Sequence, residues 1–217
     1  MARPEKTEAE HRADLIKVCQ RLGALGLIGA GEGNVSIRLG PHRVLATPSG
    51  SNKALLQAHE LVTTDPWGEK IAGRKGASSE LFMHLAVYRA RADVKAVVHA
   101  HPPTAVALTL AGISLTKAIM PEAVTALGAE IPTAPYATPS TPALAEGVAT
   151  TLGRSDACLM ERHGAIAVGR DVFEAMDRME TVERVAQVIL RAHLMHGNPT
   201  PIPDAEVKRL LQVSGRA

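Results

Sequence analysis

The chain has 217 residues, 46% of them apolar, and this composition fits a globular protein with one hydrophobic core. The formal charge is +2, Lys and Arg are scattered, and there are only one Trp, two Tyr and two Phe, which argues against nucleic acid or an anionic membrane as a partner. No stretch approaches the roughly 20 apolar residues that span a bilayer, and the start lacks an apolar signal segment, so we expect a cytoplasmic protein in which residues 1–217 form a single domain.

The first part of the chain predicts one helix followed by short strands. Thr7 and Glu10 have the spacing of a capping box, and apolar residues then recur at helical spacing, so a helix is expected over about residues 7–25. Three short segments are rich in β-branched residues and are separated by turn residues. They are 34–39, 44–47 and 61–64. These segments indicate the antiparallel beginning of a sheet.

Helices and strands alternate through the rest of the chain. Ser79 is predicted to cap a helix that runs to about residue 91. Further helices are expected over 104–110, 121–128, 142–152 and 171–195, with a short final helix after 203. Extended segments are expected over 96–101, 131–137 and 157–168, the last interrupted by His163 and Gly164. Strands enclosed by helices indicate a three-layer α/β/α domain with a mixed, mostly antiparallel central sheet.

Three histidines outline a metal site. His99 and His101 end an apolar strand, and residues at i and i+2 of a strand project from the same face, so one cation can bind both. His163 follows another strand-like run and precedes a glycine. Three neutral imidazoles with an open fourth position describe a catalytic Zn²⁺ site. Glu80, at a predicted helix start, is a candidate fourth ligand, although a carboxylate there also simply favours the helix dipole.

Three glycine-flanked polar segments predict an anion site. They are Gly31–Ser36, Thr47–Gly50 and Gly76–Ser79. Such loops offer backbone N–H groups and hydroxyls, and the last one opens a helix whose N-terminus carries partial positive charge, so a phosphate-sized anion fits. The glycines near residue 31 follow a helix and precede a strand, so they are not a dinucleotide fingerprint, and no P-loop sequence is present.

These motifs together resemble the zinc-dependent class II aldolase family of the fuculose-phosphate and ribulose-phosphate type, also called aldolase II/adducin-like. The resemblance follows the chain order of Gly33-Asn34-Val35-Ser36, Thr47-Pro48-Ser49-Gly50, Ser78-Ser79-Glu80, His99-Ala100-His101 and His163-Gly164. It implies Zn²⁺, replaceable by Mn²⁺ or Co²⁺, on His99, His101 and His163, with Glu80 as the catalytic carboxylate. It also implies a phosphate site at Gly33, Asn34, Ser49, Gly50, Ser78 and Ser79, and a homotetramer with the active site at a subunit boundary.

The activity implied by the resemblance is cleavage of a sugar phosphate. A ketose 1-phosphate, such as fuculose 1-phosphate or a deoxy or alkylthio pentulose 1-phosphate, would give dihydroxyacetone phosphate and an aldehyde through an enediolate that Zn²⁺ stabilises, while Glu80 moves the proton. Alternatives within the family are a dehydratase of the methylthioribulose-1-phosphate type, a 4-epimerase and a decarboxylase. An adducin-like interaction module without catalysis is an alternative of another class, but it would not need the three histidines.

One position departs from the family pattern. Fuculose-type aldolases use a tyrosine from across the subunit boundary as an acid/base, and the corresponding position here is Pro121. The adjacent Glu122 is therefore a candidate for acid/base work at the aldehyde end of the substrate. The alternative is that Glu122 only caps its own helix.

Overall fold

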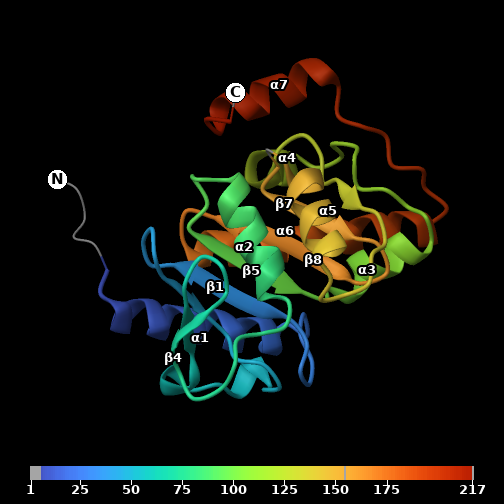
Figure 1. Cartoon of the computed structure of the whole chain (residues 1–217). Coiled ribbons are helices and arrows are strands. Elements are labelled where there is room, and N and C mark those ends of the chain that lie inside the picture. The colour runs from blue at the N-terminus through green and yellow to red at the C-terminus, as the bar shows by residue number, and fades with distance from the viewer. Residues whose placement is uncertain (1–5, 154, 217) are drawn as a thin grey trace.

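A computed structural model describes residues 6–153 and 155–216, and in this part of the chain eight strands form one mixed sheet (Figure 1). The strands are β1 Asn34–Arg38, β2 Val44–Ala46, β3 Val62–Thr64, β4 Lys70–Ala72, β5 Ala96–Ala100, β6 Thr133–Ala134, β7 Ala157–Met160 and β8 Gly164–Gly169. Their order across the sheet is β4-β3-β2-β1-β5-β8-β7-β6. Only the β6–β7 pair is parallel, which confirms the predicted mixed, mostly antiparallel sheet.

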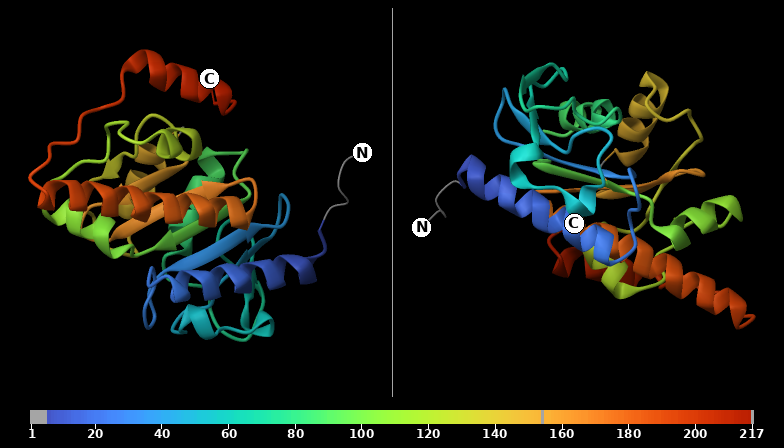
Figure 2. Two further views of the ribbon diagram at one scale, coloured as in Figure 1. Left: turned by 180° about the vertical axis from the view of Figure 1, so that it is seen from behind. Right: turned by 90° about the horizontal axis from the view of Figure 1, so that it is seen from below.

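Helices cover both faces of this sheet, as Figures 1 and 2 show, so the predicted three-layer α/β/α arrangement is confirmed. The helices are α1 Glu8–Ala24, α2 Leu81–Ala90, α3 Pro103–Leu110, α4 Pro121–Leu127, α5 Pro142–Leu152, α6 Val172–Leu194 and α7 Asp204–Val213, with short 3-10 turns η1 Lys53–Leu55 and η2 Ala58–Glu60. One apolar cluster joins the sheet to α1, α3, α4 and α6. A second joins the opposite face to α2 and α5.

The alternation along β5 decides which layer each side chain meets. Ala96, Val98 and Ala100 belong to the cluster under α1 and α6, whereas Val97 belongs to the cluster under α2 and α5. His99 is two residues from Val97 and therefore points toward the α2 layer. The strand thus directs a polar ring into the layer where α2 begins.

The caps of the helices were predicted with mixed success. At the start of α1, Thr7 and Glu10 form the expected capping box. The prediction that Ser79 caps the next helix is wrong, because α2 begins one residue later with Glu80 in the cap position and without a side-chain capping bond. The Ser79 hydroxyl instead accepts a hydrogen bond from Ser140 (3.1 Å), a residue of the loop before α5.

Regular structure is shorter than expected in one region and longer in another. Residues 131–137 were expected to be extended, but the strand β6 is confined to Thr133–Ala134. The edge strand β4 was not predicted, because all three of its residues are exposed and no apolar alternation marks it. The long helix α6 has the expected bounds and a buried apolar face.

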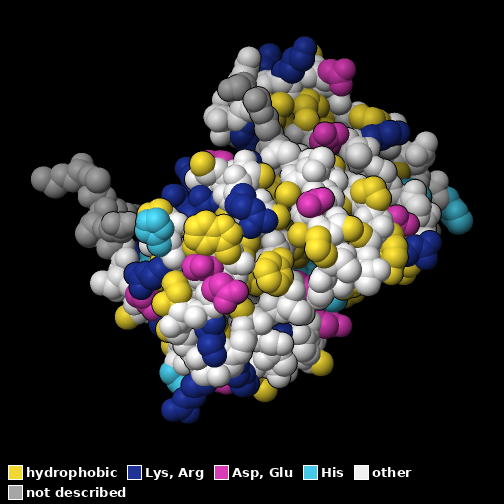
Figure 3. All heavy atoms as spheres, viewed as in Figure 1, with side chains coloured by type: hydrophobic (Ala, Val, Ile, Leu, Met, Phe, Trp, Pro, Cys, Tyr) yellow, Lys and Arg dark blue, Asp and Glu magenta, His cyan; other side chains and the backbone are white. Residues whose placement is uncertain are grey.

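None of the described helices is both long and apolar enough to cross a membrane. On the face drawn in Figure 3, acidic and basic side chains are interspersed.

Candidate metal centre and active site

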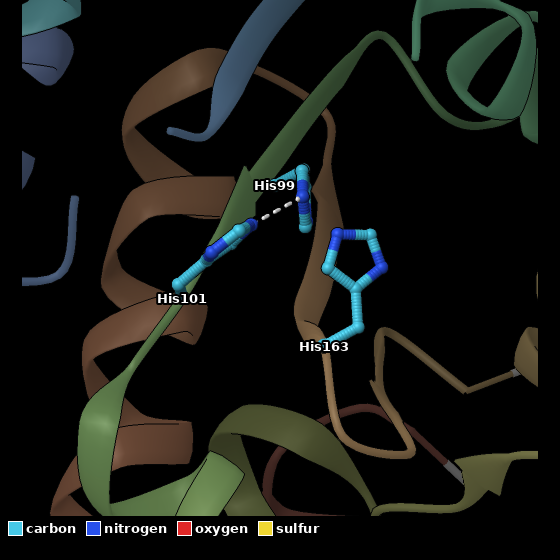
Figure 4. Close-up of side chains that lie close together, drawn as sticks. All are labelled: His99, His101 and His163. Carbon is cyan, nitrogen blue, oxygen red and sulfur yellow. Dashed lines mark hydrogen bonds between the residues drawn. The ribbon is translucent and has the colours of Figure 1, made fainter. Parts of the chain in front are cut away.

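The end of β5 and the β7–β8 turn bring the three predicted histidines together (Figure 4). In the register of the sheet His99 lies opposite Ile166, and Ala100 lies opposite Ala165 at the start of β8. The turn residue His163 immediately precedes this start, so the pairing of β5 with β8 places it beside the other two rings. The register, which joins residues more than 60 positions apart, creates the cluster.

A tight turn and a glycine allow this close approach. Arg162 has a left-handed backbone with φ 60°, and the His163 amide donates to the Met160 carbonyl (3.1 Å), which closes the turn. A Cβ at Gly164 would clash with the carbonyl oxygen of Ala100 and would lie 3.1 Å from Cε1 of His99. The glycine after the histidine is therefore needed for the packing of the rings.

The histidine geometry suits a divalent metal ion. The ring centroids are 4.9 to 5.0 Å apart, and Nε2 of His101 lies 3.1 Å from Nε2 of His99. The other ring nitrogen of His99, Nδ1, lies 2.9 Å from the Ala165 carbonyl oxygen. When Nδ1 carries the ring proton and donates it to that oxygen, the lone pair of Nε2 is free for a metal ion. One nitrogen from each ring lies within 4.8 Å of the others. Three converging imidazole nitrogens are the donor set of an open first-row metal site.

Glu80 completes this cluster from the start of α2. Its carboxylate oxygens lie 3.4 Å from Nε2 of His99 and 3.2 Å from Nε2 of His163. Asn34 donates to the same carboxylate (3.0 Å). Burial acts to raise the pKa of Glu80, but the neighbouring rings of His163 and His99 outweigh it and hold the pKa below its usual range. The carboxylate is thus ionised and faces the ring nitrogens.

One of the metal-ligating candidates, His101, is held in its neutral form. Burial and the neighbouring His99 and His163 lower the pKa of His101 to about 4. A neutral ring keeps a lone pair for a metal ion, whereas an imidazolium has none. Beneath the cluster, His84 on α2 is buried, and its Nδ1 lies 2.8 Å from Oγ of Ser36, which in turn lies 2.8 Å from the hydroxyl of Tyr88. This buried chain joins α2 to β1.

The glycine-flanked segments meet beside the histidines. Backbone bonds tie two of them together, from Ser49 to Gly76 (3.0 Å) and from Ser78 to Thr47 (3.2 Å). A hollow of about 460 Å³ opens between these segments and the cluster. Its predicted lining residues are Gly33, Ser49, Gly50, Ser78, Ser79, Glu80, His101 and His163. Asn34, predicted for the same site, is buried, and its amide contacts Glu80.

Three further residues of this hollow were missed from the sequence. Glu32 is half exposed, and its carboxylate lies 3.9 Å from Nδ1 of His101. Ser140 reaches the hollow from the loop before α5, and Lys53 reaches it from η1. The only sequence signal for Glu32 was its position between the glycines of the first polar segment. Neither Lys53 nor Ser140 lies within a motif that would have marked it.

Glu122 lies apart from this cluster within one chain. It is exposed in the first turn of α4 and lines a different hollow, together with Leu25, Thr181 and Glu183. The predicted acid/base role of Glu122 would therefore need a second copy of the chain, as the expected subunit-boundary site implies.

Comparison with known proteins identifies the family. The family model described as "Class II Aldolase and Adducin N-terminal domain" matches residues 13–190. The chain is 34% identical over 187 residues to 3-oxo-tetronate 4-phosphate decarboxylase of Pectobacterium atrosepticum, covering 84% of this chain and 85% of that one. It is 34% identical over 201 residues to 5-methylthioribulose-1-phosphate/5-deoxyribulose-1-phosphate aldolase of Rhodospirillum rubrum, covering 93% and 89%.

Solved structures agree with this assignment. An L-fuculose 1-phosphate aldolase structure superposes with a TM-score of 0.87 at 28% identity and covers 98% of this chain and 97% of that one. The chain therefore belongs to the class II aldolase and adducin family, as its sequence motifs indicated. Its relatives include aldolases and a decarboxylase, and the three histidines lie close enough together to hold a metal ion.

Proposed function

We propose that the protein is a metal-dependent lyase that cleaves a ketose 1-phosphate into dihydroxyacetone phosphate and a short aldehyde. The observation that carries this proposal is the convergence of His99, His101 and His163 with Glu80 at the wall of a hollow whose other walls include the glycine-flanked polar loops. Such a site can bind a phosphate at one side and a carbonyl at the other. Zn²⁺ is the proposed ion, with Mn²⁺ or Co²⁺ as replacements, because imidazole accepts all three.

The proposed phosphate site uses short polar residues from three loops. Ser49, Gly50, Ser78 and Ser79 line the hollow, and they offer hydroxyls and backbone N–H groups to an anion. Gly33 has a left-handed backbone with φ 66°, and a Cβ there would lie 2.9 Å from the His99 carbonyl oxygen, so glycine keeps the loop close to the metal ligands. The phosphate and the carbonyl of a small substrate can then be held together.

The chemistry requires two proton movements. When the C3–C4 bond breaks, the C4 hydroxyl loses a proton, the electron pair of the bond stays on C3, and C3 then gains a proton to give dihydroxyacetone phosphate. A divalent ion on the three histidines would supply Lewis acidity toward the substrate carbonyl. Glu80, within 3.4 Å of His99, is the proposed carrier of the proton at C3. Glu122 from a neighbouring copy is the proposed group at the C4 side, which places the complete site at a subunit boundary in a homotetramer.

A decarboxylase is the second candidate, and the Pectobacterium relative favours it. In 3-oxo-tetronate 4-phosphate, loss of the carboxyl group as CO₂ leaves an electron pair on the neighbouring carbon, and protonation of that carbon also gives dihydroxyacetone phosphate. The two reactions therefore share the phosphate, the carbonyl and the carbon that is protonated. They differ only in the leaving group, which is an aldehyde in one case and CO₂ in the other.

The test must therefore follow the leaving group as well as the shared product. Zinc-loaded protein would be incubated with fuculose 1-phosphate, 5-deoxyribulose 1-phosphate and 3-oxo-tetronate 4-phosphate, with chelator-treated protein as the control. We expect metal-dependent release of dihydroxyacetone phosphate together with an aldehyde. Release together with CO₂ would instead establish the decarboxylase. Metal-dependent turnover without dihydroxyacetone phosphate would reject both in favour of a dehydratase or an epimerase, and absence of both bound metal and turnover would support an interaction module.

A further inference from the structure

Lys53 is a buried cation beside the proposed phosphate site. Its residue is 3% exposed, and its ammonium donates to the backbone carbonyl of Gly31. Among the described residues, no carboxylate lies within ion-pair distance of it. Lysine is almost never fully buried unless it is paired, because removing the ammonium from water costs free energy that a single neutral acceptor does not recover. The position of Lys53 therefore needs an explanation.

Local packing keeps this side chain inside. Asn52 caps η1 by accepting from the Ala54 amide (3.0 Å), so the turn that begins at Lys53 is held in shape. Gly23 of α1 packs so closely against Ala54 that a Cβ on the glycine would clash with the alanine side chain. Because this contact presses the turn against α1, Lys53 cannot easily swing out into water.

The neighbouring Lys75 shows the ordinary alternative. Lys75 contacts the same loop, but its ammonium donates to the Ser51 hydroxyl (2.7 Å), lies 3.9 Å from the Glu60 carboxylate and is half exposed. Lys53, in contrast, lines the hollow together with Ser49 and Ser78 and has no acidic partner. The two lysines flank one loop, and only the buried one faces the proposed substrate.

We propose that Lys53 supplies the positive charge that balances the substrate phosphate in this hollow. The proposal rests on the proposed function, since it assigns a further binding residue to the same site. The serine and glycine groups of the loops are neutral donors, so a phosphate dianion held by them alone would be buried without a counter-charge. A charge-assisted bond to the ammonium supplies it, and the same bond offsets the cost of burying Lys53. Burial also lowers the pKa of Lys53, and a bound phosphate would act against that shift.

Calorimetry with a simple phosphate monoester tests this assignment. Zinc-loaded wild type, Lys53→Met and Lys75→Met would be titrated with glycerol 3-phosphate, and with glycerate as a carboxylate probe. We expect Lys53→Met to bind glycerol 3-phosphate about 10- to 100-fold more weakly, the usual range for losing a charge-assisted bond. Lys75→Met, which removes an exposed charge, should change the affinity by no more than about two-fold.

A second readout separates charge balance from a structural role. If Lys53 serves the phosphate, Lys53→Met without ligand should melt at the same or a higher temperature than wild type, because it removes a buried and unpaired charge, and should keep its zinc. If the lysine only anchors the Gly31 carbonyl, the variant should melt lower while its affinity for glycerol 3-phosphate stays unchanged, and the proposal is overturned. If Lys53→Met binds glycerate more weakly than wild type but binds glycerol 3-phosphate equally well, the proposal is overturned as well.

The same experiment distinguishes failure of this inference from failure of the proposed function. Wild type that binds no glycerol 3-phosphate contradicts the phosphate site itself, and with it both proposals. If Lys53→Met binds glycerol 3-phosphate as tightly as wild type does, only the role of Lys53 is contradicted. The dihydroxyacetone phosphate assay remains an independent test of the lyase.

Discussion

Two charged clusters lie at opposite ends of the central strands, and they are built in opposite ways. The histidine cluster lies where β5 ends at Ala100, opposite Ala165. The other cluster lies near the far end of the same pair of strands, where Gly169 is opposite Ala96. There the buried carboxylate of Asp156 meets three guanidinium groups. They belong to Arg91 (3.2 Å), Arg178 (2.9 Å) and Arg216 (2.5 Å).

We call the Asp156 cluster closed because its charged groups are paired with other groups of the protein. Arg91 also donates to the carbonyls of Gly153 and Ser155, and Arg216 donates to the carbonyls of Thr125 and Ala126. The histidine cluster keeps buried atoms without a protein partner, namely Oδ1 of Asn34 and Nδ1 of His163. A closed cluster of charges joins segments of the fold, here the C-terminal segment to the sheet, whereas an open one is suited to a ligand.

The largest expected effect is on the open cluster. His163→Ala removes one of three converging imidazoles from a turn at the rim of the sheet, so we expect loss of the metal ion and a fall in turnover of more than about 100-fold, with the fold retained. Metal content after dialysis and the rate of dihydroxyacetone phosphate release measure this. His193→Ala is the matched control, because its ring bonds to the Ile189 carbonyl on α6 (2.8 Å) and should leave both values unchanged. Full metal content in His163→Ala would contradict a metal site formed by these three rings.

Glu80→Gln separates metal binding from proton transfer. The amide cannot carry a proton, so turnover should fall by about 10² to 10⁴, while the zinc content stays near that of wild type because three histidines remain. Pre-steady-state product release and metal analysis check the two parts. An unchanged rate would show that another group carries the proton.

The closed cluster should respond in stability rather than in activity. Asp156→Ala leaves three guanidiniums without their shared carboxylate, and breaking such a buried network costs about 3–5 kcal/mol in free energy of unfolding. Urea unfolding measures this, and turnover per folded molecule should not change. Asp177→Ala is the control, because its exposed carboxylate lies 3.5 Å from Arg21 and should contribute no more than about 1 kcal/mol. A loss of zinc in Asp156→Ala would show that the two clusters are not independent.

The stability of the fold should also depend on pH through His84. Burial lowers the pKa of His84 to about 3, below the usual 6.5. The unfolded chain therefore takes up a proton below about pH 6.5 that the folded chain does not, and stability falls as the pH drops toward 3, by about 1.4 kcal/mol per pH unit from this one residue. In chelator-treated protein, His84→Phe should remove this contribution. The free energy of unfolding should then fall less steeply with pH, by about 1.4 kcal/mol per unit, between about pH 5.5 and 4. An identical slope in both proteins contradicts the assignment.

The sequence predicted local features of the site better than long-range ones. Strand geometry sufficed to place His99 and His101 on one face, because the two-residue repeat is a property of the strand itself. The convergence of His163 depends on the β5–β8 register, which the sequence does not display. Its position after a strand-like run and before a glycine suggested a third ligand, and the family resemblance supported that prediction. The position of Ser79 predicted that it caps the following helix. Its hydroxyl instead accepts a hydrogen bond from Ser140, a tertiary contact that the local sequence does not show.

The sequence did not reveal Lys53 for a similar reason. A lysine after Ser51 and Asn52 is expected to be solvated. Only the contact of η1 with Gly23 of α1 shows that it is enclosed. Burial of a charged residue is a property of the assembled fold, and therefore the binding residues that depend on it cannot be read from local pattern.

Anomalous diffraction at the zinc absorption edge, from crystals of the zinc-loaded protein, would locate the bound ion. We expect one strong peak at about 2.0–2.1 Å from a ring nitrogen of each of His99, His101 and His163. A fully loaded crystal with the peak elsewhere, or with no peak at the three rings, would contradict this metal site.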